Sequence, residues 1–156
     1  MATTSKKAQV PAFVRLGNVV TIALLRAGFK IVGPGVIVGR YPMYLLTVRG
    51  RKSGQPRTVP IAVIERNGKR YVGAPYGVVD WVRNLRAAGE AILTRGRRSQ
   101  TVEAHELPAR EAALVLREDV MDGNPFARYF GVTADSSMEE YERAVVKHPL
   151  FVLGDR

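Results

Sequence analysis

Residues 43–74 read MYLLTVRGRKSGQPRTVPIAVIERNGKRYVGA, and this stretch decides the fold. It alternates between turn residues and short runs rich in β-branched and aromatic residues, which predicts three strands. The runs are 44–48, 58–64 and 70–74. Asn67 and Gly68 separate the second run from the third, and both tolerate the positive φ that a type I′ turn requires. We therefore expect these two runs to pair as an antiparallel hairpin.

The chain after this stretch predicts further strands and helices. Strands are expected over 91–94, 100–107 and 150–153. Helices are expected over 80–88, capped by Asp80 and stopped by Gly89, from Pro108 to about Val120, and from Ser136 or Ser137 to Val146. Residues 95–99 read as an exposed basic hairpin loop and 126–130 as a short aromatic segment. Five or six short antiparallel strands with helices around them indicate an α+β domain built on a small barrel.

The N-terminal region, residues 10–35, predicts an amphipathic helix ended by Gly33-Pro34-Gly35. Its polar sector holds Arg15, Asn18, Arg26 and Lys30, and the apolar residues, among them Val20, Ala23 and Leu24, face elsewhere. The longest charge-free part, 16–25, is about half of the roughly 20 residues that a membrane span requires. We expect the helix to cover the core, with docking on a membrane surface as the alternative.

The composition narrows the classes of function. A chain of 156 residues fits one domain over 1–156, with residues 1–9 flexible, a barrel core over 43–107, and helices and the last strand within 108–156. The absence of cysteine excludes disulfides and thiolate chemistry and fits a cytoplasmic chain. With two histidines, no metal site is expected. The net charge of +10 favours anionic ligands.

The segment 49–57, Arg-Gly-Arg-Lys-Ser-Gly-Gln-Pro-Arg, holds four cations and no acid between two predicted strands. Its glycines let the backbone approach a ligand closely, and its charged and hydroxyl side chains donate hydrogen bonds to an anion. The order of Gly, Lys and Ser is not that of a Walker motif. The segment is either an anion-binding turn or a solvated basic hairpin.

A second candidate site lies where residues 74–77, Ala-Pro-Tyr-Gly, lead into the helix that begins near Asp80. A strand-to-helix turn leaves backbone N–H groups unpaired, and Tyr76 and Trp81 offer flat apolar surface to an aromatic ring. Burial of Trp81 in the core is the alternative interpretation.

These two motifs, in this order, resemble those of the deazaflavin-dependent nitroreductases and quinone reductases of actinobacteria and mycobacteria. Residues 45–60 match the family's strand, its Gly-Arg-Lys-Ser-Gly-x-x-Arg turn and its Thr/Val-Pro strand. Residues 74–77 and 81–85, Trp-Val-Arg-Asn-Leu, match its small-residue turn and its Trp-x-x-Asn-Leu helix. The resemblance covers residues 43–107 well and the ends loosely.

The resemblance implies a split β-barrel of the flavin-reductase and pyridoxamine-oxidase type that binds the deazaflavin coenzyme F-420 in place of FMN. The phosphodiester and oligoglutamate tail of this coenzyme would contact Arg51, Lys52, Ser53, Gly54 and Arg57. Its ring would lie near Val59, Pro60, Ala74, Tyr76, Gly77, Trp81 and Asn84.

The resemblance also implies hydride transfer from the reduced coenzyme to a small apolar acceptor such as a quinone, an enone or a nitro compound. The family's aromatic-Ala-x-Tyr segment, which covers the acceptor, is similar to Phe126-Ala-Arg-Tyr129 here. Tyr129 or Tyr76 would contact the acceptor or donate a proton, and water is a third candidate donor. Phe126 departs from the tyrosine that relatives often carry, and Tyr129 serving only in packing is the alternative.

Two other functions compete with a reductase. A carrier of deazaflavin, flavin or haem would use the same fold without turnover. The basic residues 95–98 and the small barrel also fit a single-strand nucleic-acid binder, although no stripe of tyrosines shared with these cations is expected, and no nucleic-acid partner is predicted. We expect a cytoplasmic protein, peripheral at the inner face of the membrane if the N-terminal helix docks there. The sequence leaves the oligomeric state open.

Overall fold

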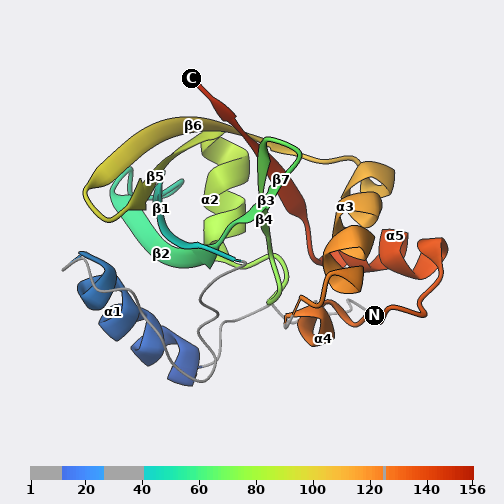
Figure 1. Cartoon of the computed structure of the whole chain (residues 1–156). Coiled ribbons are helices and arrows are strands. Elements are labelled where there is room, and N and C mark those ends of the chain that lie inside the picture. Colours follow the sequence, from blue (N-terminus) through green and yellow to red (C-terminus); the bar gives the residue numbers. More distant parts are fainter. Residues whose placement is uncertain (1–11, 27–40, 125) are drawn as a thin grey trace, which may run out of the picture.

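The computed structural model describes residues 12–26, 41–124 and 126–156, and its centre is an antiparallel sheet of seven strands that curls around helix α2 (Figure 1). The strands are β1 (Met43–Arg49), β2 (Pro56–Ala62), β3 (Ile64–Arg66), β4 (Lys69–Gly73), β5 (Glu90–Arg95), β6 (Arg98–Glu106) and β7 (Leu150–Asp155). Their order in the sheet is β2-β1-β5-β6-β7-β4-β3. This is the expected α+β split barrel, with more strands than the five or six expected.

Five helices accompany the described part of the sheet: α1 (Ala12–Arg26), α2 (Asp80–Ala88), α3 (Ala109–Met121), α4 (Ala127–Phe130) and α5 (Met138–Lys147). Helices α3, α4 and α5 gather at one end of the barrel, whereas α1 lies at the side formed by β1 and β2 (Figure 1). None of these helices has the length and apolarity that a membrane crossing requires.

The run 58–64, expected as one strand, is divided into β2 and β3 by Val63. The residues before Val63 pair with β1, where Leu46 faces Val59, and those after it pair with β4, where Ile64 faces Tyr71. The hairpin prediction therefore holds for β3 and β4 alone, and Asn67 and Gly68 have the expected positive φ of 50° and 73°. A bend at Val63 lets one run belong to both edges of the curled sheet, which a straight strand cannot do.

The other predicted elements differ from the structure mainly at their ends. The loop over 95–99 is shorter than expected, because Arg95 pairs with Arg98 and only two residues form the turn. Asp80 does not cap α2: Val79 takes that position without a side-chain hydrogen bond, and Asp80 begins the helix. The predicted cap at Ser137 is present as a capping box with Glu140.

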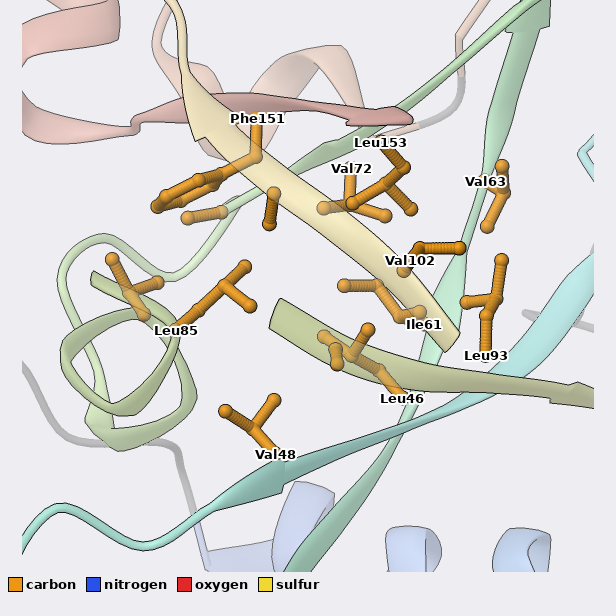
Figure 2. Packing of buried hydrophobic residues seen from close by; sticks show 14 of the residues in the cluster. Leu46, Val48, Ile61, Val63, Val72, Leu85, Leu93, Val102, Phe151 and Leu153 are labelled. Atoms are coloured by element: carbon orange, nitrogen blue, oxygen red, sulfur yellow. The ribbon is translucent and has the colours of Figure 1, made fainter. Parts of the chain in front are cut away.

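The barrel interior is filled by alternate residues of the strands together with α2. Figure 2 shows side chains from opposite parts of the sheet, such as Leu46, Leu93 and Phe151, pointing toward one interior with Leu85 of α2. Leu46 and Leu85 are fully buried. A second cluster joins α3, α4 and α5 around Leu116.

Helix α1 differs from its prediction in orientation. Asn18, from the sector expected to be polar, lines a cavity at the barrel together with Thr21, whereas the apolar Val19 and Val20 are 66% and 54% exposed. Periodicity identifies two faces of a helix but not which of them meets the barrel. The expected flexibility of residues 1–9 and the helix end at 33–35 lie outside the described residues.

Candidate functional site

Two hollows contain most of the residues that the sequence marked. The first, the basic cleft, has a volume of about 960 Å³ and lies beside the turn between β1 and β2. Its lining includes Thr47, Arg49, Gly50, Arg51, Lys52, Ser53, Gly54, Pro56, Ala87, Ala88, Glu90, Ala91, Ile92, Thr101 and Arg156. Four predicted anion-binding residues, 51–54, thus share one hollow, and Arg57 lies outside it on β2.

The turn has a fixed backbone. Gly50 N donates to Gln55 O at 2.8 Å, Gly54 N donates to Gly50 O at 2.8 Å, and Ser53 Oγ accepts from Gln55 N at 3.2 Å. A Cβ at Gly50 would stand 2.9 Å from Ser53 Oγ and 3.0 Å from Gln55 O, so a larger residue would require the turn to shift. Gly54 has a φ of 70°, which favours glycine as well. The glycines shape a compact turn that holds Lys52 at the cleft.

Arg51 connects this turn to α2. Its Nη1 donates to Asn84 Oδ1 at 2.8 Å, its backbone N donates to the same oxygen at 3.2 Å, and its Nη2 lies 3.2 Å from Asp80 Oδ1. Asn84 is 5% exposed, so these bonds satisfy a buried polar group. The structure therefore shows Arg51 and Asn84 bound to each other, in positions where they fix the turn against the helix.

The remaining charges of the cleft favour an anion. Glu90, its one acidic lining residue, is paired with Arg156 at 2.6 Å. Arg49 and Lys52 form no ion pair with any side chain in 12–26, 41–124 and 126–156. Two cations on a glycine-shaped turn fit phosphate or carboxylate groups.

The second hollow, the apolar cavity, has a volume of about 260 Å³ and lies between β2, the start of α2 and α4. Its lining is Asn18, Thr21, Tyr41, Met43, Val59, Pro60, Ile61, Ala62, Ile64, Gly73, Pro75, Tyr76, Trp81, Asn124, Phe126 and Phe130. The predicted ring-binding residues Val59, Pro60, Tyr76 and Trp81 are all in this set. Apolar walls with a few polar groups are typical of small-molecule sites.

Ala74 and Gly77 do not line either hollow, although both were predicted to contact the ring. Gly77 N donates to Ala74 O at 2.9 Å, and Gly77 has a φ of 78°, so the two residues close a turn. His148 Nδ1 also lies 3.0 Å from Ala74 O, which attaches the turn to the start of β7. The turn places Pro75 and Tyr76 at the cavity.

Tyr76 and Tyr129 meet at the edge of the apolar cavity, with ring centroids 5.3 Å apart. The guanidinium of Arg128 lies over the Tyr129 ring and donates to the Tyr129 hydroxyl at 3.0 Å. Burial and the neighbouring Tyr129 raise the pKa of Tyr76, while Arg128 opposes that shift. The Tyr76 phenol therefore keeps its proton at neutral pH. Phe126 lies next to Tyr129 and extends this aromatic wall.

The sequence did not single out Tyr41, Asn124 or the buried Asp119 behind them. Tyr41 precedes the first strand and Asn124 was assigned to a helix break, so neither carried a pattern. Asp119 did carry a signal, because it lies on the buried face of α3 with Ala112 and Leu116, where an apolar residue is expected. An acid on the apolar face of a helix is such a signal.

The two hollows share their supporting elements. Helix α2 contributes Trp81 to the apolar cavity and Ala88 to the basic cleft, roughly 10 Å further along the helix. Strand β2 contributes Pro56 to the cleft and Pro60 to the cavity. A ligand with a flat ring at one end and an anionic tail at the other fits this arrangement.

Residues 29–138 match the family model described as F420H(2)-dependent quinone reductase. The chain belongs to this family. The match spans the turn, most of the lining of both hollows and α3. It confirms the resemblance drawn from the motifs. Among curated proteins, no relative of the chain was found.

Solved structures agree with this assignment. A structure described as an F420-H2 dependent reductase, FDR-A, is 28% identical, with a TM-score of 0.51, over 76% of this chain and 99% of its own. A second, described as a domain-swapped dimer, is 26% identical, with a TM-score of 0.53, over 90% of this chain and 96% of its own. A Clostridium acetobutylicum protein of the pyridoxinephosphate oxidase family shares the fold at 10% identity and a TM-score of 0.50, over 72% and 74% of the two chains.

The family makes this chain an oxidoreductase that uses coenzyme F-420. Its residues fit that coenzyme, because the cleft offers cations to an anionic tail and the cavity offers Trp81 and Pro60 to a ring. In the described ranges no group of His, Asp and Glu side chains could hold a metal ion.

Proposed function

We propose that this family member reduces a small apolar acceptor, a quinone, an enone or a nitro compound, at the expense of reduced coenzyme F-420. The observation that carries the proposal is the apolar cavity, which has Trp81 and Pro60 on one side and the aromatic residues Tyr76 and Phe126 on another. An acceptor seated among these rings would be shielded from water and close to the proposed ring site.

Each part of the chain has a role in this proposal. The reduced coenzyme supplies the hydride. Lys52, Ser53 and Gly54 would bind its anionic tail, and Val59, Pro60 and Trp81 would hold its ring. Tyr76 and Tyr129 would contact the acceptor, because their rings meet at the cavity edge. Among the described residues, neither hydroxyl has a hydrogen bond to a carboxyl group that could replace a lost proton, and the Tyr129 hydroxyl accepts from Arg128.

The test is the oxidation of reduced coenzyme F-420 by the purified chain with menadione, cyclohexenone or a nitrobenzene derivative as acceptor. The proposal predicts loss of the reduced coenzyme that requires both protein and acceptor, with saturation in each. Tight binding of the coenzyme without turnover of any acceptor would contradict the proposal and identify the chain as a carrier.

A nucleic-acid partner is not part of the proposal, and a single tyrosine at the basic loop does not make the stripe of aromatic residues that single-strand binders use. Tyr44 does share a surface with the basic loop, since the Arg95 guanidinium lies 5.5 Å from its ring centroid. Tyr76 and Trp81, by contrast, line the apolar cavity, away from that loop. Salt-dependent retention on single-stranded DNA in preference to coenzyme would support the rejected function.

We also propose a cytoplasmic location in which α1 touches the inner face of the membrane. Val19, Val20 and Leu24 of α1 are exposed, and Arg15 and Arg26 lie on the same helix. Exposed apolar residues and cations on one helix are typical of docking on an anionic membrane surface.

A further inference from the structure

The apolar cavity has a polar region made by Tyr41 and Asn124, with Asp119 behind them. Tyr41 and Asn124 line the cavity and are 5% and 9% exposed. Asp119, on α3, is 1% exposed. The described chain buries only three polar or charged side chains outside the tyrosines, Asn84, Asp119 and Asn124, and two of them are here.

The hydrogen bonds of the Asp119 carboxyl group leave part of it unsatisfied. Its Oδ2 accepts a hydrogen bond from Asn124 Nδ2. The Tyr41 side chain acts on the same carboxyl group as a hydrogen-bond donor and lowers its pKa. Its Oδ1 has no hydrogen-bond partner. Asn124 Oδ1 in turn accepts from Phe126 N at 2.7 Å, so the cluster also fixes the segment that leads into α4.

The surroundings favour the protonated form of Asp119. Burial raises its pKa, and the neighbouring carboxylate of Asp122 acts in the same direction. The hydrogen bonds from Tyr41 and Asn124 and the charge of Arg66 on β3 oppose this rise without cancelling it. Arg66 is itself paired with Asp122 and Glu118.

A buried acid with an unpaired oxygen is costly, and an apolar residue on this face of α3 would avoid the cost. The location of the acid supplies a reason for it. Tyr41 lines the apolar cavity, and its hydroxyl hydrogen-bonds to Asp119. Among the described residues, no other carboxyl group is linked to the cavity through a tyrosine hydroxyl. A carboxylic acid behind a phenol can restore a proton that the phenol has given away.

We propose that Tyr41 is the proton donor to the acceptor and that Asp119 positions Tyr41 and restores its proton. The inference rests on the proposed function. When the acceptor gains a hydride, one of its oxygens becomes an anion. Tyr41 gives its hydroxyl proton to that oxygen, the phenolate takes the proton of the Asp119 carboxyl group, and the carboxylate regains a proton from solvent, so that charge and protons balance over the cycle.

The first test replaces Tyr41 by Phe, which removes one hydroxyl and keeps the ring. We expect kcat for menadione to fall by about 10²-fold, the contribution of a general acid, while the KM for menadione changes little. Tyr44→Phe is the matched control, because it removes a hydroxyl that lies outside the cavity and contacts Glu65. A Tyr41→Phe enzyme with the kcat of the wild type would overturn the proposal.

The second test compares the pH profiles of the wild type and Asp119→Asn. In the wild type kcat should fall as the pH rises through the pKa of Asp119, because the donor must be protonated. Asp119→Asn should have a lower kcat and lack this fall, and Asp135→Asn, which changes an exposed acid, should keep it. A fall that persists unchanged in Asp119→Asn would overturn the role of this residue.

A third measurement needs neither coenzyme nor turnover. The carbon-13 signal of the Asp119 carboxyl group, assigned by its loss in Asp119→Asn, should titrate above the ordinary value of about 3.9. It should titrate higher still in Tyr41→Phe, because the tyrosine hydrogen bond lowers this pKa. An Asp119 pKa at the ordinary value would overturn the inference even if the enzyme is active. A raised Asp119 pKa in a protein that reduces no acceptor would overturn the proposed function instead.

Discussion

Asp119 makes the stability of the fold depend on pH. Its pKa is raised in the folded protein, so the folded chain keeps this proton at pH values where the unfolded chain has lost it. The contribution of Asp119 to the free energy of unfolding is therefore complete below the unfolded pKa and is lost as the pH rises through the folded pKa.

Urea unfolding of the wild type and of Asp119→Asn, followed from about pH 4 to pH 8, isolates this contribution from that of the other carboxylates. We expect the wild type to lose stability relative to the variant as the pH rises. Two curves that stay parallel over the whole range would show that burial does not perturb Asp119.

Lys52 is the cation of the basic cleft that the structure leaves unpaired on the glycine turn. Lys52→Ala should weaken the binding of coenzyme F-420 by about 1.5 kcal/mol, the low end for a charged hydrogen bond, since the residue is exposed. Lys69→Ala, at the β3–β4 hairpin, should not change the affinity. Arg57→Ala distinguishes the prediction from the sequence motif, which places Arg57 at the anion, from the structure, which places it outside the basic cleft. A loss of coenzyme affinity equal to that of Lys52→Ala would favour the motif-based prediction.

Tyr129 lies against Tyr76 and accepts a hydrogen bond from Arg128. Tyr129→Phe keeps this ring contact and removes a polar group at the acceptor entrance. We expect the KM for menadione to rise a few-fold with kcat within about twofold of the wild type. Steady-state kinetics at saturating coenzyme measure both values, and a large fall in kcat alone would make Tyr129 the proton donor in place of Tyr41.

At the level of single residues, the sequence predicted which positions lie at the site better than it predicted which partner each residue contacts. It marked Lys52 and Trp81, which do line the two hollows. It also marked Arg51, which lines the cleft, and Asn84, which does not, and these two residues bind each other. Residue type and motif show that a position is polar and special, but only the folded chain shows whether its partner is a ligand or another side chain.

At the level of elements, local patterns predicted most helices and strands but not the curl of the sheet. The helix cap expected at Ser136 or Ser137 is at Ser137, and the turn expected at Asn67 and Gly68 is present. Both features depend on a few neighbouring residues. The bend at Val63 depends on which strands lie on either side of it, and those strands are distant in sequence. The face that α1 turns to the barrel is likewise a long-range property.

Helix α1 carries the membrane proposal. Val20→Asp places a charge on its exposed apolar residues, and we expect the variant to co-sediment less with vesicles of phosphatidylglycerol and phosphatidylcholine. Val146→Asp is a matched control, because Val146 is 67% exposed on α5, at another part of the molecule. Equal sedimentation of the wild type and Val20→Asp would contradict a role for α1 at the membrane.

For the whole molecule, the fold unites segments that are distant in sequence. The turn at 50–54 and residues 87–92 form the basic cleft with Arg156, while β2 and α2 reach from that cleft to the apolar cavity. Helix α4 covers the cavity because Asn124 and Gly73 allow Phe126 and Phe130 to pack there. This arrangement gives one elongated ligand two kinds of contact, charge at its tail and aromatic surface at its ring.

The most direct test of the central claim is a titration of the purified chain with oxidised coenzyme F-420 and, separately, with FMN, followed by the fluorescence of each ligand. The two hollows predict micromolar or tighter binding of the deazaflavin and clearly weaker binding of FMN, which lacks the oligoglutamate tail that the basic cleft would hold. Preference for FMN, or no binding of either ligand, would contradict the account.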